Sequence, residues 1–121
     1  MGVVHHAVYL EYFEVGRVEA VRRVGGSYAG TVARGVHIVV VEAAVRYLKP
    51  ARFDDVLFVG CEVGELGTVR FSFEYRVVRQ ADAALVATGR TLHACVDATT
   101  LRPLRMPDWL TADLGLLRRA P

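Results

Sequence analysis

Several residue types and patterns are scarce in this sequence, and each scarcity excludes a class of protein. It holds two cysteines, Cys61 and Cys95, in 121 residues. Because they lie in separate apolar segments without Cys-x-x-Cys spacing, we predict buried free thiols and no metal site. No apolar run approaches the ~18–20 residues that span a bilayer, and the first residues lack the pattern of a signal peptide. We therefore expect a cytoplasmic protein that does not enter a membrane.

Lysine is scarce as well, and basic residues do not cluster. Lys49 is the one lysine among 15 basic residues, and the formal net charge is +2. The arginines are scattered along the chain, so we expect no nucleic-acid partner. The planar guanidinium groups of these arginines nonetheless suit the binding of phosphate groups. The sequence also lacks a glycine-rich phosphate loop and the Ser-His-Asp or Cys-His orders of common hydrolases.

Apolar residues, by contrast, are abundant. They make up 53% of the chain, against 23% that are charged. A chain of this length can form one core but not two, so we predict a single domain over residues 1–121. The surplus of apolar residues over an average soluble domain predicts that some are buried against another subunit. A homodimer or homotetramer is therefore expected.

The predicted elements are one long helix followed by four strands. Apolar residues recur every three or four positions over residues 9–24, which predicts an amphipathic helix that Gly25 and Gly26 would end. Gly16 costs such a helix about 1 kcal/mol relative to alanine, and we expect its benefit to be a close approach to the sheet. Strands are predicted over residues 35–48, 56–66, 69–77 and 84–96, with a short helical tail over 109–119.

This order predicts an α+β fold whose four strands follow one another in meander order. The connections near residues 65–68 and Asp82 are short enough for hairpins. One face of the antiparallel sheet would pack on the long helix. The other face and at least one edge would still need cover, which dimerisation would supply.

Side chains that can do chemistry are densest at the start of the helix. Adjacent histidines such as His5 and His6 cannot both point the same way, which argues against a metal site. The free backbone N–H groups over residues 4–7 could instead stabilise the oxyanion that forms when a carbonyl is attacked. The residues alone leave open the alternative that water caps these amides. His37 and His93 are predicted to be ordinary core or interface residues.

The same segment carries a family resemblance. Residues 2–17 resemble the helix-start motif of the 4-hydroxybenzoyl-CoA thioesterase family, in particular its YbgC-like acyl-CoA hydrolases. That motif reads approximately D-T-D-x-x-G-V-V-x-H-x-x-Y-L-x-Y-F-E-x-x-R. The resemblance continues in the family's order through residues 41–42, 47–55 and 73–77 to Pro103 and Pro107, and so covers nearly the whole chain.

The resemblance implies a hot-dog fold, in which an antiparallel sheet wraps around one long helix, with the active site between subunits. It implies hydrolysis of an acyl-CoA thioester without a cofactor. The backbone N–H at His6 would polarise the thioester carbonyl, and the side chains of His6 and Tyr9 would line the acyl pocket. Both are therefore predicted to be catalytic. Other residues of the segment are predicted to bind substrate: Gly2, Val3, Val4, His5 and Tyr12.

The sequence departs from the family pattern at its catalytic aspartate. This aspartate, the second of D-T-D, aligns just before Met1, as does the family's first strand. Either the chain starts at an internal methionine, or the residue is lost and the protein works differently or not at all. Glu14 would be the substitute carboxylate, since some hot-dog enzymes place a glutamate on this helix. The alternative for Glu14 is a solvated or interface role.

Two other functions compete with hydrolysis. The missing aspartate favours a catalytically silent module that binds acyl-CoA or only oligomerises. A dehydratase acting on 3-hydroxyacyl thioesters is weaker, because no His-Asp or His-Glu pair is evident. For the CoA phosphates, arginines near strand ends are candidates, although a solvated sheet face would explain each equally well: Arg70, Arg76, Arg79 and Arg90.

Overall fold

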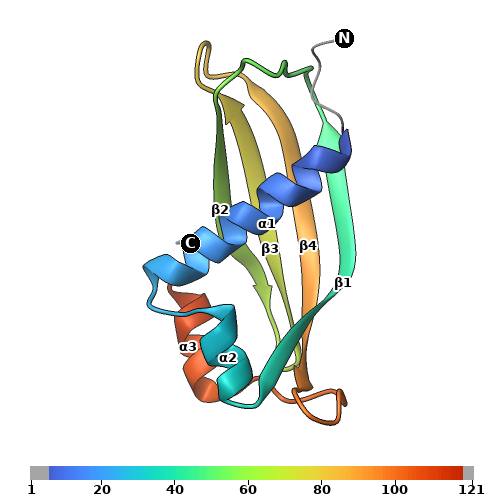
Figure 1. Ribbon diagram of the computed structural model, residues 1–121, viewed down its shortest axis with the longest axis vertical. Helices are drawn as coiled ribbons and strands as arrows, with labels where there is room; N and C mark the ends of the chain where they lie inside the picture. Colours follow the sequence, from blue (N-terminus) through green and yellow to red (C-terminus); the bar gives the residue numbers. More distant parts are fainter. Residues whose placement is uncertain (1–5, 119–121) are drawn as a thin grey trace.

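The computed structural model of the chain describes residues 6–118 and consists of three helices and four strands in that part. The helices are α1 (His6–Arg23), α2 (Tyr28–Ala33) and α3 (Asp108–Gly115). The strands are β1 (Val36–Tyr47), β2 (Leu57–Leu66), β3 (Arg70–Arg79) and β4 (Leu85–Asp97). Figure 1 shows α1 lying diagonally across one face of the sheet, with α2 and α3 beyond its C-terminal end. The predicted α+β class, a sheet packed on one long helix, is confirmed.

The sheet is antiparallel throughout, and its strands lie in the spatial order β1-β4-β3-β2. β2, β3 and β4 form a meander with two short connections, as predicted. β1 pairs with β4 rather than β2, so the prediction of meander order for all four strands is wrong. The connection over residues 48–56 is longer than a typical hairpin loop of two to five residues. It crosses the end of the sheet and delivers the chain to the far edge (Figure 1).

The core lies between α1 and the sheet and follows from the alternation of side chains along the strands. In β3, Phe73 and Tyr75 are buried on the α1 side, whereas Glu74 and its neighbour Arg76 are exposed on the other. Phe13 of α1 stacks on Tyr75, with ring centroids 4.3 Å apart. A Cβ atom at Gly89 of β4 would collide with the Phe13 ring, so glycine is what allows this ring to lie against the sheet.

Helix α1 begins three residues before the predicted start and ends as predicted. Gly25 has a φ of +87°, and the N–H of Gly26 donates to the Val21 carbonyl at 3.0 Å, which is the hydrogen bond of a left-handed C-terminal cap. A Cβ atom at Gly16 would lie 2.9 Å from Cγ1 of Val59 in β2. The expected close approach of Gly16 to the sheet is therefore confirmed.

The sequence predicts one of the two short helices, α3, and does not predict the other, α2. The tail helix was expected over residues 109–119 and is observed as α3, which ends earlier. Helix α2 was not predicted, because it is six residues long and contains Gly30 and Val32, which are poor helix formers. Its sequence signal is Ser27, whose Oγ accepts a hydrogen bond from the Gly30 N–H at 3.0 Å.

The two thiols are free, and both are at least half-buried. Cys95 is buried and Cys61 is half-buried. Burial raises the pKa of Cys61 to about 12 and that of Cys95 to about 11, so both stay protonated and unreactive near neutral pH. None of the helices in residues 6–118 is long and apolar enough to cross a membrane.

The two edges of the sheet differ. At the β2 edge, the Val63 N–H donates to the Leu117 carbonyl at 2.9 Å, and Val63 forms an isolated bridge with Arg118. The segment after α3 thus covers part of β2. At the β1 edge, no strand in residues 6–118 pairs with the outer side of β1, and Val40 and Val41 are exposed there.

Candidate active site

The start of α1 lies beside the end of β1, at one end of the sheet (Figure 1). His6 is the first residue of the helix, so the backbone N–H groups of the first turn have no acceptor within it. They carry the partial positive charge of the helix dipole. The predicted substrate-binding residues Gly2, Val3, Val4 and His5 lie outside the described residues, as does the side chain of His6.

Three tyrosines form a wall next to this helix start. Tyr9 is 3% exposed, and its ring lies edge-on to Tyr12, with centroids 5.7 Å apart. The ring centroid of Tyr47, at the end of β1, lies 5.6 Å from that of Tyr9. We call Tyr9, Tyr12 and Tyr47 the tyrosine wall. The sequence placed Tyr9 and Tyr12 here through the helix motif, but it did not single out Tyr47, which reaches the helix only through the fold.

The environment of Tyr9 keeps its hydroxyl neutral. Burial raises its pKa above the ordinary value of 10, and the neighbouring Tyr12 and Tyr47 raise it further. Tyr9 therefore remains a phenol at physiological pH and cannot act as a base there. It can pack against a substrate and donate a hydrogen bond, which suits the wall of an acyl pocket.

Glu14 does not join this group. It is exposed and follows Tyr9 by five residues, which turns it about 140° around the helix axis at 100° per residue. The structure thus brings Tyr9 and Tyr12 together and places Glu14 on another side of α1. In residues 6–118 there is also no group of His, Cys, Asp or Glu side chains that could hold a metal ion.

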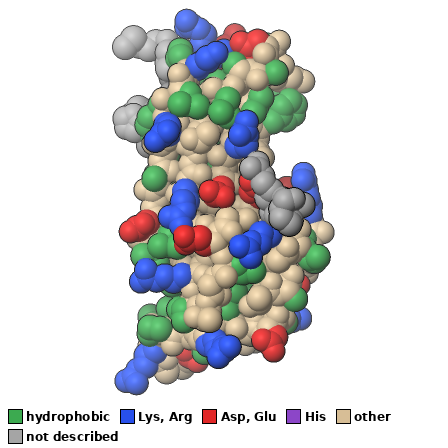
Figure 2. All heavy atoms as spheres, turned by 180° about the vertical axis from the view of Figure 1, so that it is seen from behind, with side chains coloured by type: hydrophobic (Ala, Val, Ile, Leu, Met, Phe, Trp, Pro, Cys, Tyr) green, Lys and Arg blue, Asp and Glu red, His purple; other side chains and the backbone are tan. Residues whose placement is uncertain are grey.

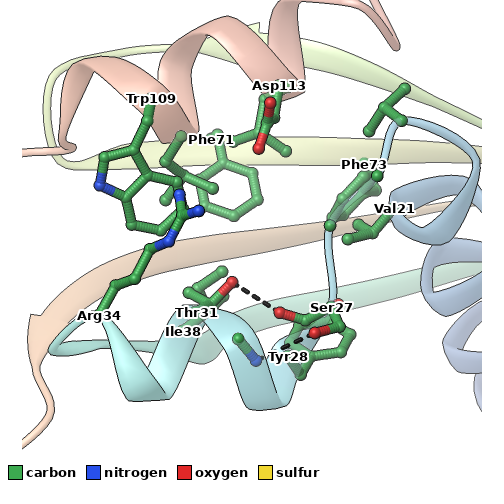
Figure 3. A pocket seen from close by; sticks show the side chains of 16 residues that line it. Val21, Ser27, Tyr28, Thr31, Arg34, Ile38, Phe71, Phe73, Trp109 and Asp113 are labelled. Atoms are coloured by element: carbon green, nitrogen blue, oxygen red, sulfur yellow. Dashed lines mark hydrogen bonds between the residues drawn. The ribbon is translucent and has the colours of Figure 1, made fainter.

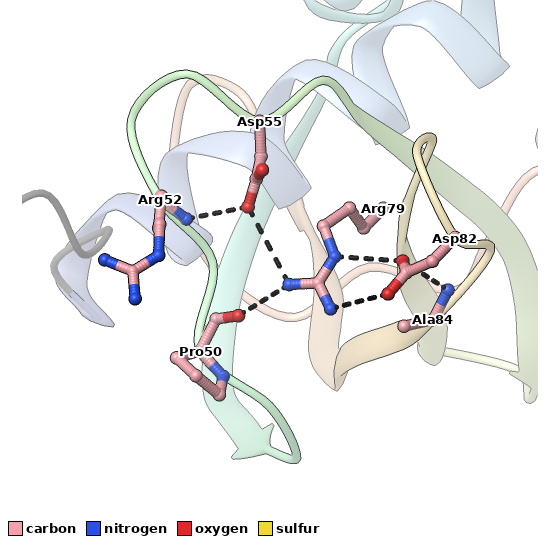
Figure 4. Close-up of polar contacts among 6 residues, drawn as sticks. All are labelled: Pro50, Arg52, Asp55, Arg79, Asp82 and Ala84. Atoms are coloured by element: carbon pink, nitrogen blue, oxygen red, sulfur yellow. Dashed lines mark hydrogen bonds and ion pairs between the residues drawn. The ribbon is translucent and has the colours of Figure 1, made fainter.

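Arg79 ties three segments together at this end of the sheet (Figure 4). Its Nε and Nη2 donate to the two carboxylate oxygens of Asp82, at 2.9 and 3.0 Å. Its Nη1 donates to the Pro50 carbonyl at 2.8 Å and lies 3.8 Å from Oδ2 of Asp55. Asp55 in turn accepts a hydrogen bond from the Arg52 N–H at 2.8 Å. The connection that follows β1 is thereby fixed to the β3–β4 hairpin.

This role removes Arg79 from the candidates for phosphate binding. Hydrogen bonds from Arg79 lower the pKa of Asp82 to about 2, and the same contacts raise the pKa of Arg79. Its guanidinium is already occupied by two carboxylates and a carbonyl. Arg79 instead positions the loop beside the tyrosine wall, and sequence alone could not show this because its partners are distant in the chain.

The other three candidate arginines point to the outer face of the sheet. Arg90 lies 3.0 Å from Glu65, and both side chains are well exposed, so this ion pair is weak. Arg70 and Arg76 are exposed on β3. Figure 2, which views the molecule from the side away from α1, shows basic and acidic side chains interspersed on this face. The face has no concentrated positive patch.

A chain of polar groups runs from α1 through the core to β4. Arg17 of α1 hydrogen-bonds to Tyr28 and to Tyr75. The Tyr75 hydroxyl lies 2.6 Å from Oγ1 of Thr91, which lies 2.7 Å from Nε2 of His93. His93 is 1% exposed, and its Nδ1 has no partner in the described part of the chain. The prediction of a core histidine is confirmed for His93.

Comparison with known proteins places this geometry in a family. The model of the thioesterase-like superfamily matches residues 1–114. The acyl-CoA thioester hydrolase YbgC of Escherichia coli is 32% identical over 112 residues, which are 93% of this chain and 83% of that protein. The structure of the hypothetical protein TT1821 from Thermus thermophilus is 39% identical, with a TM-score of 0.87, and covers 98% of this chain and 88% of its own. The DHNA-CoA thioesterase from Staphylococcus aureus is 28% identical, with a TM-score of 0.85 over 96% of this chain and 80% of its own. This chain therefore belongs to the thioesterase-like superfamily.

Proposed function

We propose that the chain hydrolyses acyl-CoA thioesters to a free acid and CoA, with the thioester carbonyl held at the start of α1. The observation that carries the proposal is the start of α1 at His6, where the amide N–H groups of the first turn have no acceptor within the helix, beside the tyrosine wall. Membership of the thioesterase-like superfamily and 32% identity to an acyl-CoA thioester hydrolase support the reaction class.

The chemistry follows from the charge at the helix start. Water adds to the carbonyl carbon and loses a proton to a general base, for which Glu14 is the candidate carboxylate, and the carbonyl oxygen takes the negative charge. The amides at the start of α1 stabilise this oxyanion better than the neutral carbonyl, so they lower the barrier. The carbonyl then re-forms, the carbon–sulfur bond breaks, and CoA leaves as a thiolate.

The proposal includes a second copy of the chain. An exposed edge strand with apolar side chains is a template for pairing, and β1 is such a strand. Antiparallel pairing of two β1 strands would place the beginning of one beside the end of the other, next to Tyr47 and the start of α1. We therefore propose a cytoplasmic homodimer with each site at the interface between copies, and the rival homotetramer is distinguished by mass in solution.

Substitution of His6 tests the role of its backbone amide. Proline is tolerated at the first residue of a helix and has no N–H, so His6→Pro removes the proposed donor while keeping the helix. We expect kcat to fall about 10²–10³-fold, as it does when one oxyanion donor is lost. His6→Ala is the matched control, because it keeps the amide and removes only the side chain. Equal activity of His6→Pro and His6→Ala would contradict the proposed carbonyl position.

Glu14→Gln tests the candidate carboxylate. If Glu14 takes the proton from water in a site completed by a second copy, kcat should fall about 10²-fold or more. An unchanged kcat would assign Glu14 to the solvated surface.

The reaction itself is tested by release of free thiol from a panel of short, long and aromatic acyl-CoAs. Hydrolysis of at least one of them is expected. If CoA binds but no acyl-CoA is hydrolysed, the chain is a binding module, and if neither occurs, the proposal is wrong.

A further inference from the structure

A cavity of about 100 Å³ lies at the opposite end of α1 from the candidate active site. It is enclosed by the C-terminal end of α1, helices α2 and α3, and the inner face of the sheet (Figure 3). Phe71 and Phe73 form its floor, and Val21, Ile38 and Leu114 belong to its walls. An apolar cavity of comparable size in another protein, about 150 Å³, takes up benzene. This one can therefore hold a few carbon atoms.

One side of the cavity carries a cation–π pair, Arg34 and Trp109. Arg34, just after α2, reaches toward α3, and its guanidinium carbon lies 4.6 Å from the ring centre of Trp109. This cation–π contact uses the charge of the guanidinium, and no hydrogen bond from its N–H groups to a side chain or carbonyl in residues 6–118 accompanies it. Trp109 is the sole tryptophan of the chain, so its indole signal reports on this side of the cavity without overlap from another tryptophan.

The remaining polar groups around the cavity divide into two kinds. Ser27 and Thr31 are engaged within α2, since Ser27 Oγ accepts from the Gly30 N–H and Thr31 Oγ1 donates to the Ser27 carbonyl at 2.9 Å. In residues 6–118, by contrast, the side chains of Arg34 and Asp113 form no ion pair and no hydrogen bond, whereas their backbone groups are engaged at the helix ends. A polar group of a ligand would therefore meet Arg34 or Asp113.

We propose that this cavity is a binding site for a small monocarboxylic acid with a short apolar body. The carboxylate would accept hydrogen bonds from the free N–H groups of Arg34, which match a carboxylate in geometry and charge. The apolar body would lie on Phe71 and Phe73. Asp113 opposes a second negative charge inside the cavity, so the site excludes dicarboxylates.

This proposal is independent of the helix-start site and concerns a different part of the fold. It rests on the proposed function only for the source of the acid, because hydrolysis of an acyl-CoA releases a monocarboxylic acid. The cavity would then bind a product-like molecule away from the place where the product forms. Binding can be measured without any thioester, so the two proposals can fail separately.

The test is titration of the intact protein with sodium butyrate at pH 7, followed through the indole N–H signal of Trp109 in NMR spectra. We expect a saturable shift with a dissociation constant on the order of millimolar. Succinate, with the same number of carbons and two carboxylates, should give no saturable shift. Butan-1-ol should bind more weakly than butyrate, and butylamine should not compete with it.

Three variants locate the site. Arg34→Gln should weaken butyrate about tenfold or more, the usual factor for a lost charge-assisted hydrogen bond. Leu114→Phe should fill the cavity and abolish binding, with its fold checked by circular dichroism. Arg22→Gln, which removes an arginine whose side chain is 72% exposed on α1, is the matched control and should leave binding unchanged.

Several outcomes would overturn the proposal. These are no saturable shift up to high millimolar butyrate, equal losses from Arg34→Gln and Arg22→Gln, or tighter binding of butylamine than of butyrate. Binding of butyrate by a protein that hydrolyses no acyl-CoA would uphold the cavity site and reject the proposed function. Hydrolysis of an acyl-CoA by a protein that does not bind butyrate would uphold the proposed function and reject the cavity site.

Discussion

The two edges of the sheet differ in how their unpaired backbone groups are covered. Both β1 and β2 end the sheet and expose backbone groups that could pair with another strand. At the β2 edge, the segment after α3 pairs with Val63, and α1 lies close to the same strand through Gly16 and Val59. At the β1 edge, nothing in residues 6–118 provides such cover, and exposed Val40, Val41 and Tyr47 lie along the strand.

The difference identifies β1 as the edge that suits the proposed association. Residues 6–118 cover part of the β2 edge and supply no strand that pairs with the outer side of β1, so the β1 side is suited to association. The uncovered edge is also the one that ends at the tyrosine wall. The proposed association and the candidate site therefore share β1, whereas β2 contacts other parts of the same chain.

The largest effect is expected from charges placed on the β1 edge. The double variant V40K/V41K adds two positive charges to each copy at exposed positions, and the pairing of two such edges would bring like charges together. We expect a monomer in analytical ultracentrifugation and a loss of thioesterase activity of at least about tenfold, because the site would lose its second copy.

The β2 edge offers the matched control for this experiment. Phe58 is 57% exposed on β2, so Phe58→Lys places a charge on the opposite edge with similar exposure. The oligomeric state and the activity should not change. If Phe58→Lys separates the copies and V40K/V41K does not, the assignment of the two edges is reversed.

The next effect concerns the cover of the β2 edge. Leu117 packs against the core and its carbonyl binds the Val63 N–H, whereas its neighbour Leu116 is 70% exposed. Leu117→Asp should lower the free energy of unfolding by about 1–3 kcal/mol, since a charge would enter an apolar contact. Leu116→Asp should change it by less than about 0.5 kcal/mol. Urea unfolding curves of both variants would show this difference, and equal values would contradict the cover.

A smaller effect concerns the strand to which β1 is paired. His93 of β4 lies opposite Val40, and burial, assisted by the positive charge of Arg17, lowers the His93 pKa to about 4. Between about pH 6.5 and 4 the unfolded chain takes up a proton that the folded chain does not. Stability should therefore fall as the pH is lowered through this range. His93→Phe should flatten the decline in thermal unfolding, and an unchanged slope would contradict a buried neutral imidazole.

The smallest effect concerns the loop that leaves β1. Asp82 has its pKa lowered to about 2, so its interaction with Arg79 stabilises the fold above about pH 4 and is lost as the pH falls toward 2. Asp82→Asn should make the loss of stability between pH 4 and 2 shallower. Arg79→Gln should do the same, because it removes the cause of the shift. A variant that keeps the original steepness would show that the acid sensitivity lies elsewhere.

Much of the fold could be predicted because its signals are local. The alternation in β3 and the helical spacing in α1 are read within a few residues, and glycine at Gly25 marks the helix end by its own conformation. The partner of β1 could not be predicted in the same way. Pairing with β4 joins Val36 to Asp97, far apart in the chain, and depends on the path of the connection over residues 48–56.

The candidate site likewise contains residues that a local motif predicts and residues that only the fold brings together. The family motif identified Tyr9 and Tyr12, because both belong to one turn of one helix. Tyr47 and Arg79 come from distant segments and act through contacts that only the folded chain makes. Glu14 is the opposite case, since its separation of five residues from Tyr9 already predicts a different direction from the helix axis.

The contact of Phe13 with Gly89 fixes how α1 lies above the sheet, and with it the position of the helix start at the candidate site. One aromatic ring fits one gap in β4, so α1 can lie at a single height and rotation above the sheet. Deleting one residue of α1 between His6 and Phe13 would turn the helix start by about 100° and shift it by about 1.5 Å while this contact stays in place. Homologues should therefore vary in length on either side of the segment from His6 to Phe13, and not within it.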